Sequence, residues 1–123
     1  MQASVFISGA AQGIGAEIAR LFHKNGYKVG IYDINQELAE QLATELGENA
    51  KAGYLDVSNY RQWQIALQEF RNWAGELNIL VNNAGILYSG AFENTEIQSH
   101  HRTIDINVKG VINGCHTALN HLQ

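Results

Sequence analysis

The feature that most constrains this chain is a glycine-rich turn at residues 8–15, SGAAQGIG, between an apolar run at residues 3–7 and an amphipathic segment. A strand that ends at such a turn and continues as a helix leaves the first N–H groups of the helix without partners. These groups and the helix dipole together favour an anion. Gly9 would allow the tight turn, Gly13 would let the backbone approach a diphosphate, and Gly15 would let the helix pack closely on the sheet. The turn therefore predicts a diphosphate cradle, with a merely connecting loop as the alternative.

Apolar periodicities of two kinds alternate along the rest of the chain. Runs rich in aliphatic and aromatic residues predict strands at residues 3–7, 27–33, 54–57 and 77–81. Helical spacing predicts helices that begin at Ile14, after Asn35, after Ser58 or Asn59, and at Ile97, the last of them continuing to the end of the sequence. Alternating strands and helices imply a parallel sheet with right-handed crossovers. We therefore expect a doubly wound α/β fold with strand order 3-2-1-4 and a ligand crevice at the carboxyl ends of the first and fourth strands.

The last predicted helix carries a long apolar stripe: Ile97, Ile104, Val108, Val111, Ile112, Cys115, Leu119 and Leu122. We interpret Cys115 on this stripe as a small core residue rather than a reactive thiol. Asn107 also falls on the stripe, and a buried carboxamide at that position would need hydrogen-bond partners.

Composition narrows the possible functions further. With 123 residues, of which 46% are hydrophobic, the chain is predicted to form one domain. A net charge of −4 with scattered basic residues argues against a nucleic acid or an anionic membrane as the main partner. We find no leader-like or membrane-spanning stretch, and the single cysteine fits a cytoplasmic location. The spacings of the five histidines do not favour a metal site.

Asp33 ends the second predicted strand, 18 residues after Gly15, where dinucleotide-binding folds place the carboxylate that binds the adenosine ribose. A 2′-phosphate near this carboxylate would be repelled, and neither Ile34 nor the alanines at positions 10 and 11 supply a compensating cation. The cofactor predicted is therefore NAD rather than NADP. The alternative is a solvated aspartate at the start of a turn.

The glycine spacing G-x-x-x-G-x-G, with Ser8 in front of it, resembles the short-chain dehydrogenase/reductase family. So does Asn82-Asn83-Ala84-Gly85 directly after an apolar strand, and so does Asn107 in the sequence Asn-Val-Lys-Gly.

The resemblance implies a role for each of these residues. Gln12 and Ile14 would line the cofactor together with the three glycines of the turn. Asp56 and Val57 would bind the adenine ring. The asparagines at positions 82 and 83 would tie the fourth strand to its neighbours, and Asn83, Ala84 and Gly85 would line the nicotinamide ribose. Asn107 would hold a water that relays protons to the catalytic lysine.

The chain departs from that family in one respect, because none of its tyrosines is followed four residues later by a lysine. We therefore interpret residues 1–123 as the N-terminal, cofactor-binding half of a longer enzyme that interconverts a secondary alcohol and a ketone, inactive by itself. Family resemblance implies a homodimer or homotetramer formed through the fourth and fifth helices. A complete non-catalytic nucleotide-binding or interaction module stays open, and a methyltransferase is disfavoured by Asn82 to Gly85.

Overall fold

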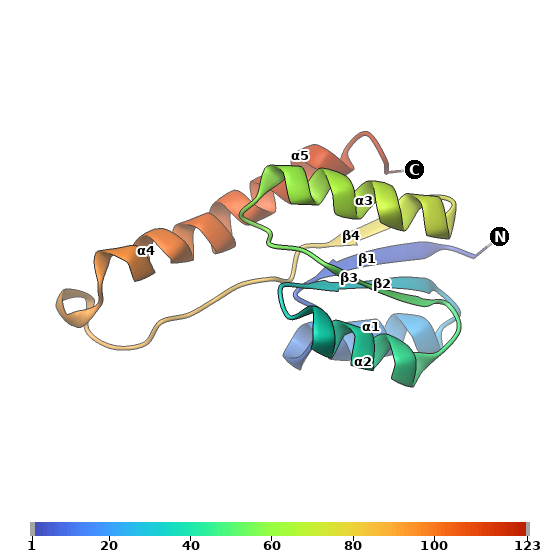
Figure 1. The fold of residues 1–123 in the computed structure, drawn as a ribbon, viewed down its shortest axis with the longest axis horizontal. Helices are drawn as coiled ribbons and strands as arrows, with labels where there is room; N and C mark the ends of the chain where they lie inside the picture. Colours follow the sequence, from blue (N-terminus) through green and yellow to red (C-terminus); the bar gives the residue numbers. More distant parts are fainter. Residues whose placement is uncertain (1, 123) are drawn as a thin grey trace.

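The computed structural model describes residues 2–122, in which four parallel strands form one sheet in the order β3-β2-β1-β4. The strands are β1 (Ser4–Ser8), β2 (Lys28–Asp33), β3 (Ala50–Tyr54) and β4 (Ile79–Val81). The helices are α1 (Gly13–Lys24), α2 (Gln36–Leu46), α3 (Tyr60–Ala74), α4 (Ile97–Ile104) and α5 (Gly110–Ala118), with a 3₁₀ turn, η1 (Phe92–Asn94), and a π-helical turn, η2 (Asp105–Lys109). α1 and α2 cover one face of the sheet, α3 and α5 cover the other, and α4 projects beyond the carboxyl ends of the strands (Figure 1). The predicted doubly wound fold and strand order are confirmed.

The strands build a separate core on each face of the sheet. In β1, Val5 and Ile7 are buried against α1 and α2, whereas Phe6 points to the opposite face. There Phe6 stacks on Tyr32 of β2, with ring centroids 4.4 Å apart, and lies 5.7 Å from the ring of Trp63 in α3. A parallel sheet covered on both faces needs apolar residues at successive positions, and all five residues of β1 are buried.

Asparagine caps start the second and third helices as the sequence predicted. The side chain of Asn35 accepts a hydrogen bond from the backbone N–H of Leu38 at 3.1 Å, and Asn59 does the same for Gln62 at 3.0 Å. Gly47 follows α2 with a φ of 82°, in the left-handed region that favours glycine.

The third strand was placed wrongly from the sequence. β3 spans Ala50–Tyr54, whereas the predicted range was 54–57. Leu55 and Val57 are buried, but they lie in the connection after the strand. β3 is the edge of the sheet and pairs only with β2, so its sequence AKAGY has no continuous apolar run. The apolar pattern at residues 54–57 indicated side chains that are buried in the connection, not residues that pair in the sheet.

The long C-terminal helical segment also differs from expectation. It ends at Ala118, within the described residues, and changes to π-helical geometry at Asp105–Lys109. The predicted stripe faces outward: Ile104, Ile112 and Leu119 are 49%, 59% and 72% exposed. Cys115 is exposed with it, so its assignment to the core was wrong.

The segment packs instead through a face of mostly small side chains: Ile106, Gly110, Gly114, Thr117 and Ala118. A Cβ at Gly110 would lie 2.7 Å from a methyl group of Val57, and one at Gly114 would lie 2.7 Å from the Trp63 indole. Glycine at these two positions lets the helix lie directly on α3 and on the connection after β3. Within residues 2–122, no helix is both long and apolar enough to cross a membrane.

Candidate functional site

The glycine turn joins β1 to α1 at the carboxyl end of the sheet. Gly9 has a φ of 65°, and a Cβ there would lie 2.7 Å from the Cα of Ala84, so only glycine fits between β1 and the segment after β4. A Cβ on Gly15 would collide with the carbonyl oxygen of Gly9. Gly13 has a φ of 62° and no heavy atom of the described chain within 4 Å of its Cβ position, so it borders open space at the start of α1. Gln12, the residue before α1, gives the helix no side-chain cap.

Ser8 and Asn83 hold the turn against the end of β4. The Ser8 hydroxyl accepts hydrogen bonds from the backbone N–H groups of Asn83 and Ala84, at 3.1 Å and 3.2 Å. The Asn83 carboxamide donates to the carbonyl oxygen of Gly9 at 2.9 Å. Asn82 reaches the other way, toward Cys115, with its amide nitrogen 3.5 Å from the sulfur. The hydroxyl and the Asn83 carboxamide thus fix how β1 and β4 meet at the crevice.

Two carboxylates lie at the carboxyl ends of β2 and β3, and hydrogen-bond donors orient each of them. Asp33 accepts from the backbone N–H of Ala11 at 3.0 Å and from that of Asn35 at 2.9 Å. Asp56 accepts from both the backbone N–H and the hydroxyl of Ser58, at 3.0 Å and 2.7 Å. Asp33 therefore links the end of β2 to the glycine turn.

A pocket of about 330 Å³ collects most of the predicted site at the carboxyl ends of the strands. Its predicted lining residues are Gly9, Gln12, Asp33, Asp56, Val57, Asn83, Ala84 and Gly85. Gly13, Ile14, Gly15 and Asn107 do not line it. Sequence reasoning missed Ile34, Leu55, Ile86, Arg102 and Ile106, which complete its walls. Arg102, Ile106 and Gly110, four residues apart each time, share one helix face, but this spacing does not indicate that the face meets the pocket.

Asn107 lies beside this pocket, on the π-helical turn. It is exposed, so its predicted burial was wrong. Both polar groups of its carboxamide are nevertheless engaged: the oxygen accepts from the backbone N–H of Ile86 at 2.9 Å, and the nitrogen donates to the carbonyl of Ile86 at 2.8 Å. This pair of bonds holds the segment after β4 to the helix. π-helical turns inside helices are frequent at functional sites.

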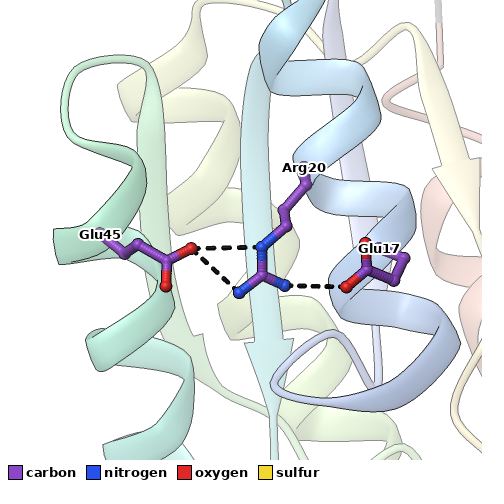
Figure 2. Close-up of polar contacts among 3 residues, drawn as sticks. All are labelled: Glu17, Arg20 and Glu45. Atoms are coloured by element: carbon purple, nitrogen blue, oxygen red, sulfur yellow. Dashed lines mark hydrogen bonds and ion pairs between the residues drawn. The ribbon is translucent and has the colours of Figure 1, made fainter.

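A larger surface groove, of about 840 Å³, runs between α1 and α2. Arg20 of α1 bridges Glu17 of its own helix and Glu45 of α2, with nitrogen–oxygen distances of 3.2 Å and 2.9 Å (Figure 2). These side chains are partly exposed, so the bridge contributes little net free energy of folding. The groove shares Gln12 with the pocket at the strand ends, and it is also lined by Gly13 and Ile14 of the predicted cofactor site. In the described part of the chain, no group of three or more His, Cys, Asp or Glu side chains could hold a metal ion.

Comparison with known proteins agrees with this geometry. The family model described as short chain dehydrogenase matches residues 3–123. The chain belongs to the short-chain dehydrogenase family. Members of this family are oxidoreductases with a fold that binds a nicotinamide dinucleotide.

Individual members of the short-chain dehydrogenase family are similar to this chain over most of its length. A 3-beta-hydroxysteroid dehydrogenase from Comamonas testosteroni is 38% identical over 109 residues, covering 89% of this chain and 43% of the relative. A mitochondrial borneol dehydrogenase from Lavandula x intermedia is 39% identical over 112 residues, covering 88% of this chain and 42% of the relative. The chain therefore spans less than half the length of these relatives.

A solved structure of the same family has closely similar geometry. It is a 3-ketoacyl-(acyl-carrier-protein) reductase from Brucella melitensis complexed with NADH, 33% identical, with a TM-score of 0.94. The match covers 97% of this chain and 49% of that one. The strand order and the placement of the glycine turn are thus those of a short-chain dehydrogenase.

Proposed function

We propose that this chain is the NAD-binding portion of an oxidoreductase that interconverts a secondary alcohol and a ketone. The observation that carries the proposal is the pocket at the strand ends, where the glycine turn, Asp33, Asp56 and the segment after β4 converge. The names of two relatives support the reaction class, because borneol and 3-hydroxysteroids are both secondary alcohols.

The residues of the turn fit the diphosphate of a dinucleotide. The start of α1 lacks a side-chain cap, and Gly13 leaves open space in front of it, so N–H groups of the first turn can face an anion. The open side of Gly13 is where a diphosphate could approach the backbone closely, with Gln12 and Ile14 beside it and Gly15 behind it.

Asp33 would bind the adenosine ribose and so select NAD. Its carboxylate is oriented by Ala11 and Asn35, and an ionised oxygen can accept further bonds from the ribose hydroxyls. The repulsion between this carboxylate and each charge of a 2′-phosphate is about 4 kcal/mol at about 4 Å and an effective dielectric of 20.

Asp56 and Val57 would hold the adenine, and Asn83, Ala84 and Gly85 would line the ribose next to the nicotinamide. The dinucleotide supplies or accepts the hydride when it is bound. Asn107 would hold the water of the proton relay. Its two bonds to Ile86 fix the side chain, and one N–H and one lone pair of the carboxamide stay available to a water. The tyrosine and lysine that move the proton would follow residue 123 in the natural protein.

The wider assignments follow from the same proposal. Residues 1–123 would form one cofactor-binding unit, the natural protein would act on a small alcohol or ketone in the cytoplasm, and it would assemble as a homodimer or homotetramer. Exposed Ile104, Ile112 and Leu119 on the outer face of the C-terminal helical segment support the last point, since an apolar stripe of this kind is typical of an interface.

Calorimetric titration of the natural full-length protein with NAD, NADP and S-adenosylmethionine tests the proposal. We expect NAD to bind most tightly, and we expect reduction of NAD with at least one member of a panel of secondary alcohols. Binding of S-adenosylmethionine without NAD would refute the dinucleotide assignment. NAD binding without turnover on any alcohol or ketone would favour a non-catalytic module instead.

A further inference from the structure

Arg102 of α4 is the one basic residue among those that line the pocket at the strand ends. Its side chain is half-buried, and within residues 2–122 its guanidinium makes no hydrogen bond or ion pair. A guanidinium has five donors and a flat, delocalised face, so one that lines a pocket without a protein partner has its binding capacity left for a ligand.

The two carboxylates of the pocket do not account for this charge. Asp33 is satisfied by backbone donors from Ala11 and Asn35, and Asp56 by the backbone and hydroxyl of Ser58. Neither is within ion-pair distance of Arg102. Among residues 2–122, the guanidinium is therefore not held by an ion pair with either carboxylate.

The helical segment that carries Arg102 forms one wall of the pocket. Gly110 packs on Val57, and Ile106 lies one turn earlier in the same cluster of buried residues as Leu55 and Val57. Arg102 is one further turn toward the N-terminus, in α4. Figure 1 shows that α4 projects past the strand ends. Arg102 borders the pocket from the helical side. The same segment contacts the connection after β3 through Gly110 and Val57. It contacts the segment after β4 through Asn107 and Ile86.

We propose that the guanidinium of Arg102 lies against the face of the adenine ring of the bound dinucleotide. The inference rests on the proposed function, in which Asp56 and Val57 hold that ring. A planar cation over an aromatic face is attracted by the ring and also gives it a flat surface to stack on. Val57 and Ile106 supply apolar surface beside it, so the base is held by packing as well as by charge.

The test compares Arg102→Ala and Arg102→Lys with the parent protein of natural length. Ligands are NAD and adenosine, which has the base but no phosphate, and affinities are measured by calorimetry. We expect Arg102→Ala to weaken both ligands by the same factor, about 2- to 30-fold. Arg102→Lys keeps the charge without the plane, so we expect it to recover only part of the loss. Lys109→Ala, which removes a charge from the same helical segment outside the pocket, should leave both affinities unchanged.

Three outcomes would overturn the inference. Equal affinity of the parent and Arg102→Ala for both ligands, with NAD binding intact, would refute the role of Arg102 and leave the proposed function standing. A loss for NAD alone, with adenosine unchanged and a steeper salt dependence in the parent, would show a phosphate contact instead. Failure of the parent itself to bind NAD would refute the proposed function together with this inference. Thermal melting of each variant separates a lost contact from a lost fold, and we expect no shift because the Arg102 side chain has no polar partner among residues 2–122.

Discussion

Replacing Asp33 by asparagine should narrow the protein's preference for NAD over NADP. The charge of Asp33 would face the 2′-position of the adenosine ribose, where NADP carries a phosphate and NAD a hydroxyl. At about 4 kcal/mol per charge, and 1.4 kcal/mol per tenfold change, full removal of the repulsion would correspond to roughly a thousandfold change in relative affinity. Solvent screening and movement of the phosphate reduce this, so we expect the ratio of the NADP and NAD dissociation constants to fall by about 10- to 1000-fold.

The same substitution should carry a cost in stability. The carboxylate accepts from Ala11 and Asn35 through its two oxygens, and an asparagine can offer only one oxygen to these two N–H groups. The unpaired donor should lower the free energy of unfolding by about 1–3 kcal/mol. Chemical denaturation with and without cofactor measures this cost separately from the change in cofactor preference.

Asp56→Asn is the matched control, because it removes one charge from the same pocket at the end assigned to adenine. We expect it to weaken NAD and NADP about equally and to leave their ratio unchanged. The reasoning fails if Asp33→Asn leaves the ratio where it was, or if both variants change it alike, since the discrimination would then not depend on the position of the charge.

Four further predictions concern the rest of the chain. Gly13→Val should lower NAD affinity at least tenfold in calorimetry, whereas Gly47→Val, at an equally open left-handed position away from the pocket, should lower only the melting temperature. Gly114→Ala should lower the free energy of unfolding by about 1–3 kcal/mol in denaturant titration, because its methyl group would press on an indole ring and a carboxamide. Ile112→Lys combined with Leu119→Lys should reduce self-association of the 123-residue chain in light scattering without lowering its melting temperature, since both side chains are exposed. That chain alone should show no alcohol oxidation with NAD in an absorbance assay, and turnover would contradict our placement of the proton-transfer groups beyond it.

The predicted site residues that line the pocket come from the ends of the four strands or from the connections after them. The glycine turn follows β1, Asp33 ends β2, Asp56 follows β3 and Asn83 follows β4. In a parallel sheet the carboxyl ends of all strands lie on the same side of the sheet, so a correct strand order is enough to bring these residues together. The bounds of β3 were predicted several residues too late, yet Asp56 was still placed correctly. The connection after β3 begins at the carboxyl end of the sheet, and Asp56 lies in it.

The helical wall of the pocket could not be found in this way. Whether Arg102 and Ile106 face the crevice depends on the rotation of the C-terminal helical segment, and the contacts of Gly110 with Val57 and of Gly114 with Trp63 set that rotation. The apolar stripe predicted the wrong buried face of this segment. Glycine lets a helix pack closely on its neighbours, but it does not contribute to a hydrophobic pattern, so the face that is buried was not recognised. Asn107 and Cys115 were misplaced for the same reason.

The hydrogen bonds at the site connect these observations to its chemistry. Ser8 and Asn83 join β1 to β4, Asp33 joins β2 to the glycine turn, and Asn107 joins the segment after β4 to the helix. Each of these bonds has a side chain on one side and backbone on the other, so the crevice is shaped before any ligand enters it. A preformed crevice loses less conformational entropy on binding, which leaves more of the interaction energy for affinity.

If these hydrogen bonds preform the crevice, Ser8→Ala should weaken NAD binding, although the Ser8 hydroxyl itself is buried. The substitution removes the acceptor for two backbone N–H groups at the crevice floor and so loosens the pocket. Unchanged NAD affinity in Ser8→Ala would show instead that the glycine backbone alone holds the crevice in shape.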